Sequence, residues 1–163
     1  MVATEVAGMN DIQTYLDEAV ALAFDNVAAG GRPFGAVVVR DGAEIARGVN
    51  RMLADNDPTA HAELTALRAA GSALASPRLD GCEVYASGQP CPMCMAAMRM
   101  AGVSRIGFVY SNEQAEPFGL STAQIGAALA PPLAEQDWAI IEHHPRADGE
   151  RGHLYRAWRA HSG

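Results

Sequence analysis

The chain has 163 residues, 49% hydrophobic and 19% charged, which is typical of one globular domain with a packed core. No apolar run reaches the roughly 18 residues of a membrane span, and the acidic start lacks the features of a secretory signal. Nineteen acidic residues face twelve basic ones, all arginines, for a net charge of -7. Nucleic-acid binders present basic surface, so this balance argues against a polynucleotide partner. We expect a single cytoplasmic domain over residues 1–163, with no nucleic-acid or membrane partner.

Strands and helices are predicted to alternate along the chain. Apolar residues at helical spacing predict helices over 10–29, 59–71, 91–102, 121–129 and 154–160. Strand-like runs cover 33–40, 43–50, 82–87, 105–110 and 138–143. This alternation indicates a layered α/β sheet with helices on its faces.

Individual residues predict where several of these helices and strands begin or end. Asn10 or Asp11 is expected to cap the first helix, and Thr59 the second. The Asp41-Gly42 turn would join the first two strands as a hairpin. Pro92 stands in the first turn of the third helix, where a proline is tolerated.

Two predicted helix starts carry chemically reactive side chains. His61 and Glu63 open one helix, and Cys91 and Cys94 open another. Both sulfurs would then lie near unpaired backbone N–H groups, which stabilise thiolates. One histidine nitrogen and two thiolates supply three ligands of a tetrahedral Zn²⁺ and leave the fourth position for water, as in catalytic sites. Glu63 is placed to handle protons beside the metal.

Each of these features alone has a plainer interpretation. The Cys-x-x-Cys pattern also occurs in thioredoxin-like redox pairs, and an acidic residue in a first helical turn usually complements the helix dipole. A zinc-stabilised binding module is a further alternative, although a structural zinc would prefer a fourth Cys or His. Together, His-x-Glu and Pro-Cys-x-x-Cys favour a zinc-dependent nucleobase deaminase.

The stretches RPFGAVVVRDG, NDPTAHAE and GQPCPMCMAAMRMAG resemble the cytidine deaminase superfamily, within it the guanine deaminase and tRNA adenosine deaminase branch. The resemblance covers most of residues 32–106. It implies a three-layer α/β/α fold with a mixed five-stranded sheet. It also implies a homodimer, with C-terminal segments exchanged between subunits and a lid segment at about 143–163.

The resemblance further implies a zinc-dependent aminohydrolase that releases ammonia from a small heterocyclic base. Guanine, cytosine and aminotriazines are the substrate types considered. Adenosine-to-inosine editing of tRNA is the alternative, and the net charge of -7 speaks against it.

Residue roles follow from the same resemblance. His61, Cys91 and Cys94 would bind Zn²⁺, and Glu63 would transfer protons to the ring and to the departing ammonia. Glu142, beside His143 at the end of the last predicted strand, would be a second proton-handling group. The candidates for substrate binding are Asn50 (a hydrogen bond to the base), Phe34 and Phe118 (flanking a planar ring), and Ala62.

Two positions depart from the pattern of the resembled family. Gln89 stands where glutamate usually precedes Pro-Cys, which removes a charge beside the predicted zinc site. Guanine deaminases also carry an acidic residue in the loop after the strand 105–110, where this chain has Leu120, Ser121 or Thr122. A neutral side chain pairs less well with the N–H donors of guanine, so the choice among bases stays open.

Overall fold

Four strands form one mixed sheet in the described part of the computed structural model, which is residues 2–145 and 152–162, with side chains from residue 11 onward. The strands are β1 (Gly35–Arg40), β2 (Ala43–Val49), β3 (Cys82–Gly88) and β4 (Arg105–Tyr110). Their order is β2-β1-β3-β4. Strand β1 is antiparallel to both of its neighbours, whereas β3 and β4 are parallel. The prediction of an α/β fold with a mixed sheet is confirmed.

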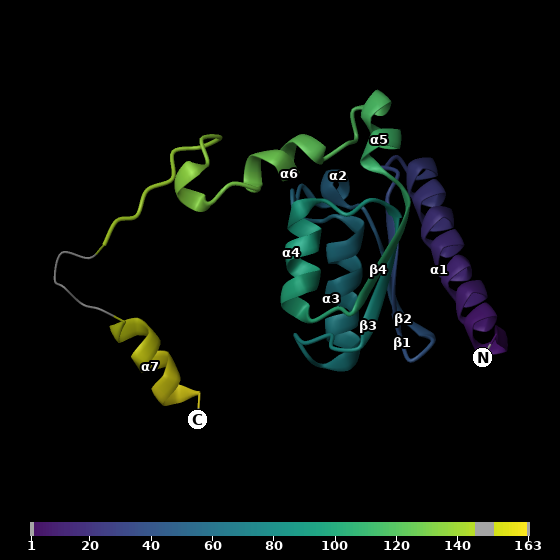
Figure 1. Cartoon of the computed structure of the whole chain (residues 1–163), viewed down its shortest axis with the longest axis horizontal. Helices are drawn as coiled ribbons and strands as arrows, with labels where there is room; N and C mark the ends of the chain where they lie inside the picture. Colours follow the sequence, from purple (N-terminus) through teal and green to yellow (C-terminus); the bar gives the residue numbers. More distant parts are fainter. Residues whose placement is uncertain (1, 146–151, 163) are drawn as a thin grey trace. The chain divides into compact units, whose positions relative to one another are not determined.

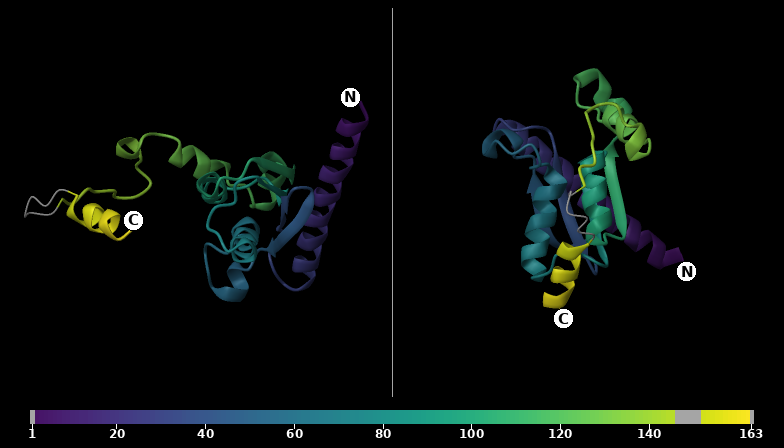
Figure 2. Two further views of the ribbon diagram at one scale, coloured as in Figure 1. Left: turned by 90° about the horizontal axis from the view of Figure 1, so that it is seen from below. Right: turned by 90° about the vertical axis from the view of Figure 1, so that its left-hand side faces the viewer.

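Helices cover both faces of this sheet (Figures 1 and 2). Helix α1 (Val2–Ala28) packs on one face, and α3 (Ala62–Leu74) and α4 (Pro92–Ala101) pack on the other. Successive side chains of a strand point to opposite faces. In β1, Val37 therefore packs toward α1, and Val38 packs toward α3 and α4. The result is three layers with two apolar interfaces.

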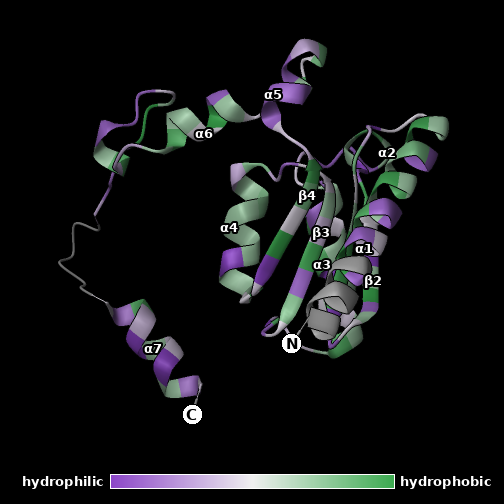
Figure 3. Ribbon diagram, turned by 45° about the vertical axis from the view of Figure 1, so that its right-hand side comes forward, coloured by the Kyte–Doolittle hydropathy of each residue, from purple (hydrophilic) through white to green (hydrophobic). Residues whose placement is uncertain are grey.

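The helix α4 is hydrophobic along most of its length (Figure 3). Its Cys94 and Met98 are fully buried, whereas Met95 and Met100 are exposed. Cys82 of β3 is also fully buried, as expected for a small core residue. The remaining helical elements are α2 (Met52–Asp55), α5 (Asn112–Ala115), η1 (Glu116–Phe118), α6 (Ala123–Leu129), η2 (Leu133–Glu135) and α7 (His153–His161).

The sheet has four strands, not the five that were predicted. Residues 138–143, expected as the last strand, contain neither helix nor strand. A strand needs a neighbour to pair its backbone groups, and the described residues from 128 onward contain no other strand. The side chain of Ile140 is 90% exposed, so this segment buries little. Glu142 is consequently not at the end of a strand.

The first helix also begins earlier than expected, at Val2 rather than near Asn10. Residues 2–9 include alanine, glutamate and methionine, which favour helix, so the capping side chains near residue 10 do not start it.

The chain divides into two compact units, residues 1–127 and 128–163. The second unit contains η2 and α7, and α7 has no buried residue. The predicted lid at about 143–163 belongs to this unit, and its residues 146–151 and 163 lie outside the described residues. Among the described helices, none has the length and apolar composition needed to cross a membrane.

Candidate active site

One edge of the sheet brings together residues that are distant in the sequence. Gly35 at the start of β1 lies opposite Val49 at the end of β2, and Gly88 at the end of β3 lies opposite Tyr110 at the end of β4. The residues just beyond these positions therefore lie at the same end of the sheet, where these strands start or finish. The N-termini of α3 and α4 supply His61 and Cys91 to the same place.

The loop before α3 positions His61. The carboxylate of Asp57 accepts hydrogen bonds from the backbone N and the Oγ1 of Thr59, at 2.8 and 2.7 Å. The backbone N of Arg51 donates to the carbonyl of Ala60 at 2.9 Å. The prediction that Thr59 caps the helix is wrong: the helix begins at Ala62, three residues later, and the Thr59 hydroxyl oxygen accepts from the side chain of Arg68 instead. His61 occupies the N-cap position.

The three predicted metal ligands lie together. His61 Nδ1 is 3.4 Å from Cys91 Sγ and 3.6 Å from Cys94 Sγ, and the two sulfurs are 3.6 Å apart. A tetrahedral Zn²⁺ with Zn–S near 2.3 Å and Zn–N near 2.0 Å holds such atoms about 3.5–3.8 Å apart. The donor set therefore fits zinc in both chemistry and spacing, with three protein ligands and one open position.

The electrostatics of the two sulfurs differ. A hydrogen bond from the Cys94 thiol lowers the pKa of Cys91 to about 4, and the contact with His61 acts in the same direction. The pKa of Cys94 is raised, because it shares this hydrogen bond with Cys91 and because it is buried. Binding of a metal ion by both sulfurs therefore releases the proton of Cys94.

Glu63 is the buried carboxylate beside this cluster. It is 7% exposed, and its Oε2 lies 3.5 Å from Cys94 Sγ. Burial raises the pKa of Glu63. A carboxyl group with a raised pKa holds a proton more readily than an ordinary carboxylate, which suits general acid–base chemistry.

A polar cavity of about 60 Å³ opens next to the cluster. Its lining residues come from the sheet edge, from both helix N-termini and from the loop after β4: Arg32, Phe34, Asn50, His61, Glu63, Gln89, Cys91, Leu120 and Thr122. A Cβ on Gly88 would lie 3.1 Å from the Phe34 ring, so the bare glycine lets this ring lie against the end of β3.

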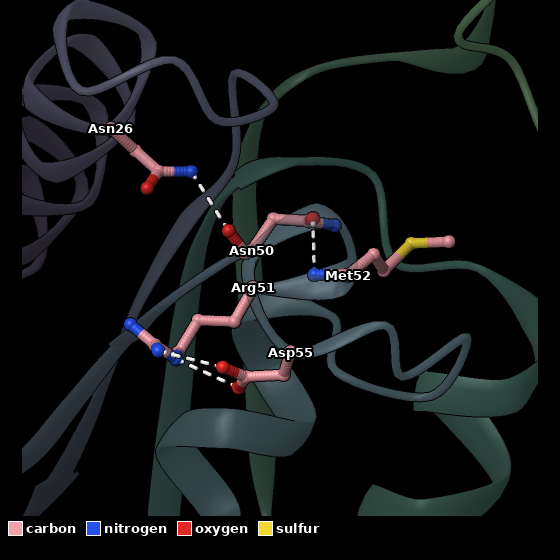
Figure 4. Close-up of polar contacts among 5 residues, drawn as sticks. All are labelled: Asn26, Asn50, Arg51, Met52 and Asp55. Atoms are coloured by element: carbon pink, nitrogen blue, oxygen red, sulfur yellow. Dashed lines mark hydrogen bonds and ion pairs between the residues drawn. The ribbon is translucent and has the colours of Figure 1, made fainter.

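Asn50 is held rigidly in the wall of this cavity. It is 5% exposed, and its backbone carbonyl accepts from Asn26 Nδ2 at 2.9 Å. Its side-chain Oδ1 accepts from the backbone N of Met52 at 3.2 Å, beside the paired side chains of Arg51 and Asp55 (Figure 4). The Asn50 side chain thus has a fixed orientation.

The other predicted site residues lie elsewhere. Phe118 is 77% exposed and lines a separate apolar cavity of about 270 Å³, which shares Phe34 and Leu120 with the polar one. Ala62 is buried in the core, and the cavity lining does not include it. Glu142 belongs to the second unit, where it is exposed and lies 3.4 Å from His144 Nε2. The roles of these residues stay predictions.

Sequence reasoning missed Arg32 as a cavity residue. The only signal was its place in the stretch RPFG, directly before β1. The long, exposed side chain gave no periodic pattern from which its position could be inferred.

Comparisons of the sequence and of the fold with known proteins all find deaminases. Residues 9–110 match the cytidine and deoxycytidylate deaminase zinc-binding region. The guanine deaminase of Bacillus subtilis (strain 168) is 42% identical over 148 residues, which cover 90% of this chain and 93% of that protein. The X-ray structure of guanine deaminase from Bacillus subtilis matches with a TM-score of 0.81 at 38% identity, covering 91% of this chain and 93% of that one.

A shorter likeness links the chain to RNA-editing enzymes. The tRNA-specific adenosine deaminase of Agrobacterium fabrum is 47% identical over 74 residues, which are 45% of this chain and 49% of that protein. The resemblance inferred from the sequence motifs is confirmed.

Proposed function

The chain belongs to the cytidine and deoxycytidylate deaminase family, and we propose that it removes the amino group of a small free base by hydrolysis. The predicted enzyme class, a zinc-dependent deaminase, is confirmed by this membership. Guanine is the first substrate type to consider because of the 42% identity to a guanine deaminase. Cytosine and aminotriazines are the other two substrate types that we propose. The observation that carries the proposal is the cluster of His61, Cys91 and Cys94 beside the buried carboxylate of Glu63.

The residues of the site divide the chemical work. His61, Cys91 and Cys94 would hold the ion, and bound Zn²⁺ supplies a water nucleophile by lowering the pKa of that water toward neutrality. Glu63 would carry protons on its carboxylate, first to the ring nitrogen next to the reacting carbon and then to the departing ammonia. Asn50 would hydrogen-bond the base and Phe34 would lie against its face, which fixes the ring in place.

Editing of tRNA is the alternative function. Its support is the sequence likeness to a tRNA-specific adenosine deaminase over 45% of this chain, and the match to a solved tRNA:A34 deaminase structure over 71% of this chain with a TM-score of 0.61. The net charge of -7 and the lack of lysine speak against it, because an RNA-binding surface neutralises phosphates with basic side chains. A small free substrate is therefore the better proposal.

We also propose a cytoplasmic homodimer that exchanges C-terminal segments, with residues from about 143 acting as a lid. Support comes from apolar side chains exposed on the edge strand β4 (Phe108, Tyr110) and on α7 (Leu154, Trp158). The three free cysteines suit a reducing compartment. Light scattering on the intact chain should give twice the monomer mass, and a monomer that is fully active would remove the dimer proposal.

Glu142 is proposed as a second proton-handling group that acts once the lid closes. A lid that excludes water would strengthen the hydrogen bonds of the site. If the role is right, Glu142→Gln lowers kcat about a hundredfold with zinc retained. Unchanged kcat in both Glu142→Gln and Glu142→Ala would make it an ordinary surface residue.

A screen for ammonia release tests the proposed function. The zinc-loaded protein is offered free bases, their ribonucleosides, aminotriazines and a tRNA anticodon stem-loop. We expect turnover of at least one free base or aminotriazine. Turnover of the tRNA stem-loop alone would replace the proposal with the alternative, and no release from any substrate would reject both.

A further inference from the structure

Asn26, near the C-terminal end of α1, joins two segments of the cavity wall. Its Nδ2 donates to the backbone carbonyl of Arg32 at 2.7 Å and to the backbone carbonyl of Asn50 at 2.9 Å. Carbonyl oxygens can only accept, so the side-chain atom between them is the NH₂ group, whose two protons serve the two bonds. The amide of Asn26 is therefore oriented by its partners, and Figure 4 shows it directed at the carbonyl of Asn50.

Two glycines let α1 come close enough for these contacts. A Cβ on Gly31 would lie 2.5 Å from Asn26 Nδ2, so a side chain at this position would displace the amide. A Cβ on Gly35, the first residue of β1, would clash with the carbonyl oxygen of Ala19 in α1. The backbone N of Gly31 also donates to the carbonyl of Asn26 at 2.8 Å. The backbone and the side chain of Asn26 thus both bind the segment that leads into β1.

The backbone of Asn50 is held from both sides. Its N–H donates to the carbonyl of Phe34 at 3.1 Å, and its carbonyl accepts from Asn26. Its side-chain Oδ1 accepts from the backbone N of Met52 (Figure 4). Among these three partners, Asn26 contributes a side chain and the other two contribute backbone groups. A substitution of Asn26 therefore removes one support of Asn50 and leaves Asn50 itself unchanged.

We propose that Asn26 is a positioning residue for substrate binding, which acts by holding the backbone of Asn50. Asn50, Arg32 and Phe34 line the polar cavity, whereas the lining does not include Asn26. A side chain whose backbone is already fixed binds a ring without first losing the freedom of a mobile loop. This inference rests on the proposed deaminase function and on the proposed contact between Asn50 and the base.

Kinetics of the zinc-loaded protein test this role with three variants. Asn26→Ala removes both donors. Asn26→Asp keeps the size of the side chain but turns a carboxylate oxygen toward two carbonyl oxygens, which it repels. Gln13→Ala is the matched control, because Gln13 also carries an amide on α1 and its Nε2 donates to the exposed Asp17 of the same helix at 2.8 Å. Each variant is assayed with guanine, cytosine and ammeline, and zinc is measured on the same preparation.

We expect Asn26→Ala to raise KM for the best of these substrates about tenfold, with kcat and zinc content close to wild type. The reason is that the hydrogen bonds of Asn26 go to the cavity wall and not to the metal ligands. Asn26→Asp should raise KM further, and Gln13→Ala should keep both constants. A merely structural role would lower the melting temperature without this separation of KM from kcat.

A double-mutant cycle with Asn50→Ala shows whether Asn26 acts through Asn50. Asn50→Ala keeps the backbone carbonyl that Asn26 binds but removes the amide that is proposed to contact the base. In this background, Asn26→Ala should change KM less than about twofold. An increase of about tenfold in both backgrounds would overturn the inference, and so would an unchanged KM in Asn26→Ala and Asn26→Asp.

Hydrogen–deuterium exchange separates this inference from the proposed function, because it needs no turnover. The amide proton of Asn50, which is bonded to the carbonyl of Phe34, should exchange about tenfold faster in Asn26→Ala than in wild type and in Gln13→Ala. Unchanged exchange would overturn the inference. Wild type that deaminates none of the three bases, with exchange accelerated in Asn26→Ala, would overturn the proposed function instead.

Discussion

Three side chains that could hold a metal ion and one neighbouring buried carboxylate form the centre of the proposed site. Two of the proposed ligand residues, His61 and Cys91, are N-cap residues of helices, and Cys94 lies in the first turn of α4. Unpaired backbone N–H groups at such positions favour thiolates. The sulfur and nitrogen spacing matches a tetrahedral ion without rearrangement of the backbone.

Removal of one sulfur should therefore abolish metal binding. We expect Cys94→Ala to lose most of its zinc, because two remaining ligands hold the ion weakly. Cys82→Ala is a matched control, since Cys82 is equally buried, makes no disulfide and lies outside the cluster. Elemental analysis should find about one zinc per chain in wild type and in Cys82→Ala. Full zinc occupancy in Cys94→Ala would mean that the metal binds elsewhere.

At the scale of elements, local patterns predicted the strands and helices of the first unit well. The valine run of β1, the Asp41-Gly42 turn and Pro92 at the start of α4 act through neighbouring residues, so sequence alone sufficed. The expected strand at 138–143 failed because a strand also depends on a partner that local sequence does not specify. The expected cap at Thr59 failed because hydrogen bonds from both its backbone N and its hydroxyl to Asp57 hold Thr59 in the loop, and the helix begins only after His61.

The Asp57 loop gives a pH-dependent contribution to stability. Hydrogen bonds from Thr59 lower the pKa of Asp57, so its ionised form stabilises the fold above the unfolded pKa of about 3.9, and this contribution is lost as pH falls through the folded pKa. Asp57→Asn keeps an oxygen acceptor but does not titrate. We expect wild type to melt about 2–4 °C above the variant at pH 6.5.

Measuring the melting temperatures of wild type and Asp57→Asn again at pH 3.5 checks whether the charge on Asp57 stabilises the loop. The melting difference should shrink there, and acid effects that both proteins share, including zinc loss, cancel in the difference. A gap that stays constant between the two pH values would show that the charge on Asp57 does not stabilise the loop.

For the molecule as a whole, the acidic composition and the family relationship point to a small substrate. The net charge of -7 gives no attraction for phosphate backbones, and the identity to a guanine deaminase extends over 90% of the chain. We expect kcat/KM for the preferred free base to exceed that for its ribonucleoside at least tenfold, because the proposed lid, once closed on a base, would leave no room for a ribose. Equal values for the two would argue against a closing lid.

The site itself was only partly predictable. His61, Glu63, Cys91 and Cys94 were found from sequence because their spacing on two helix starts is a local pattern. On the opposite wall, Asn50, Phe34 and the loop with Leu120 and Thr122 were expected near the base from the resemblance. Arg32 was missed, because only the folded sheet brings its chain segment to the cavity. Substrate choice depends mainly on that wall, and for this reason motif spacing alone does not identify the base.

Turnover and zinc content of Glu63→Gln, measured on one preparation, test most directly whether the metal cluster serves hydrolytic deamination. Glutamine keeps the size and burial of the side chain but cannot accept and return a proton. We predict about one zinc per chain, as in wild type, and a loss in kcat of about 10²–10⁴ or more on the best free base. Zinc retained with near-native turnover would contradict the assignment of Glu63 and, with it, the deaminase mechanism of this site.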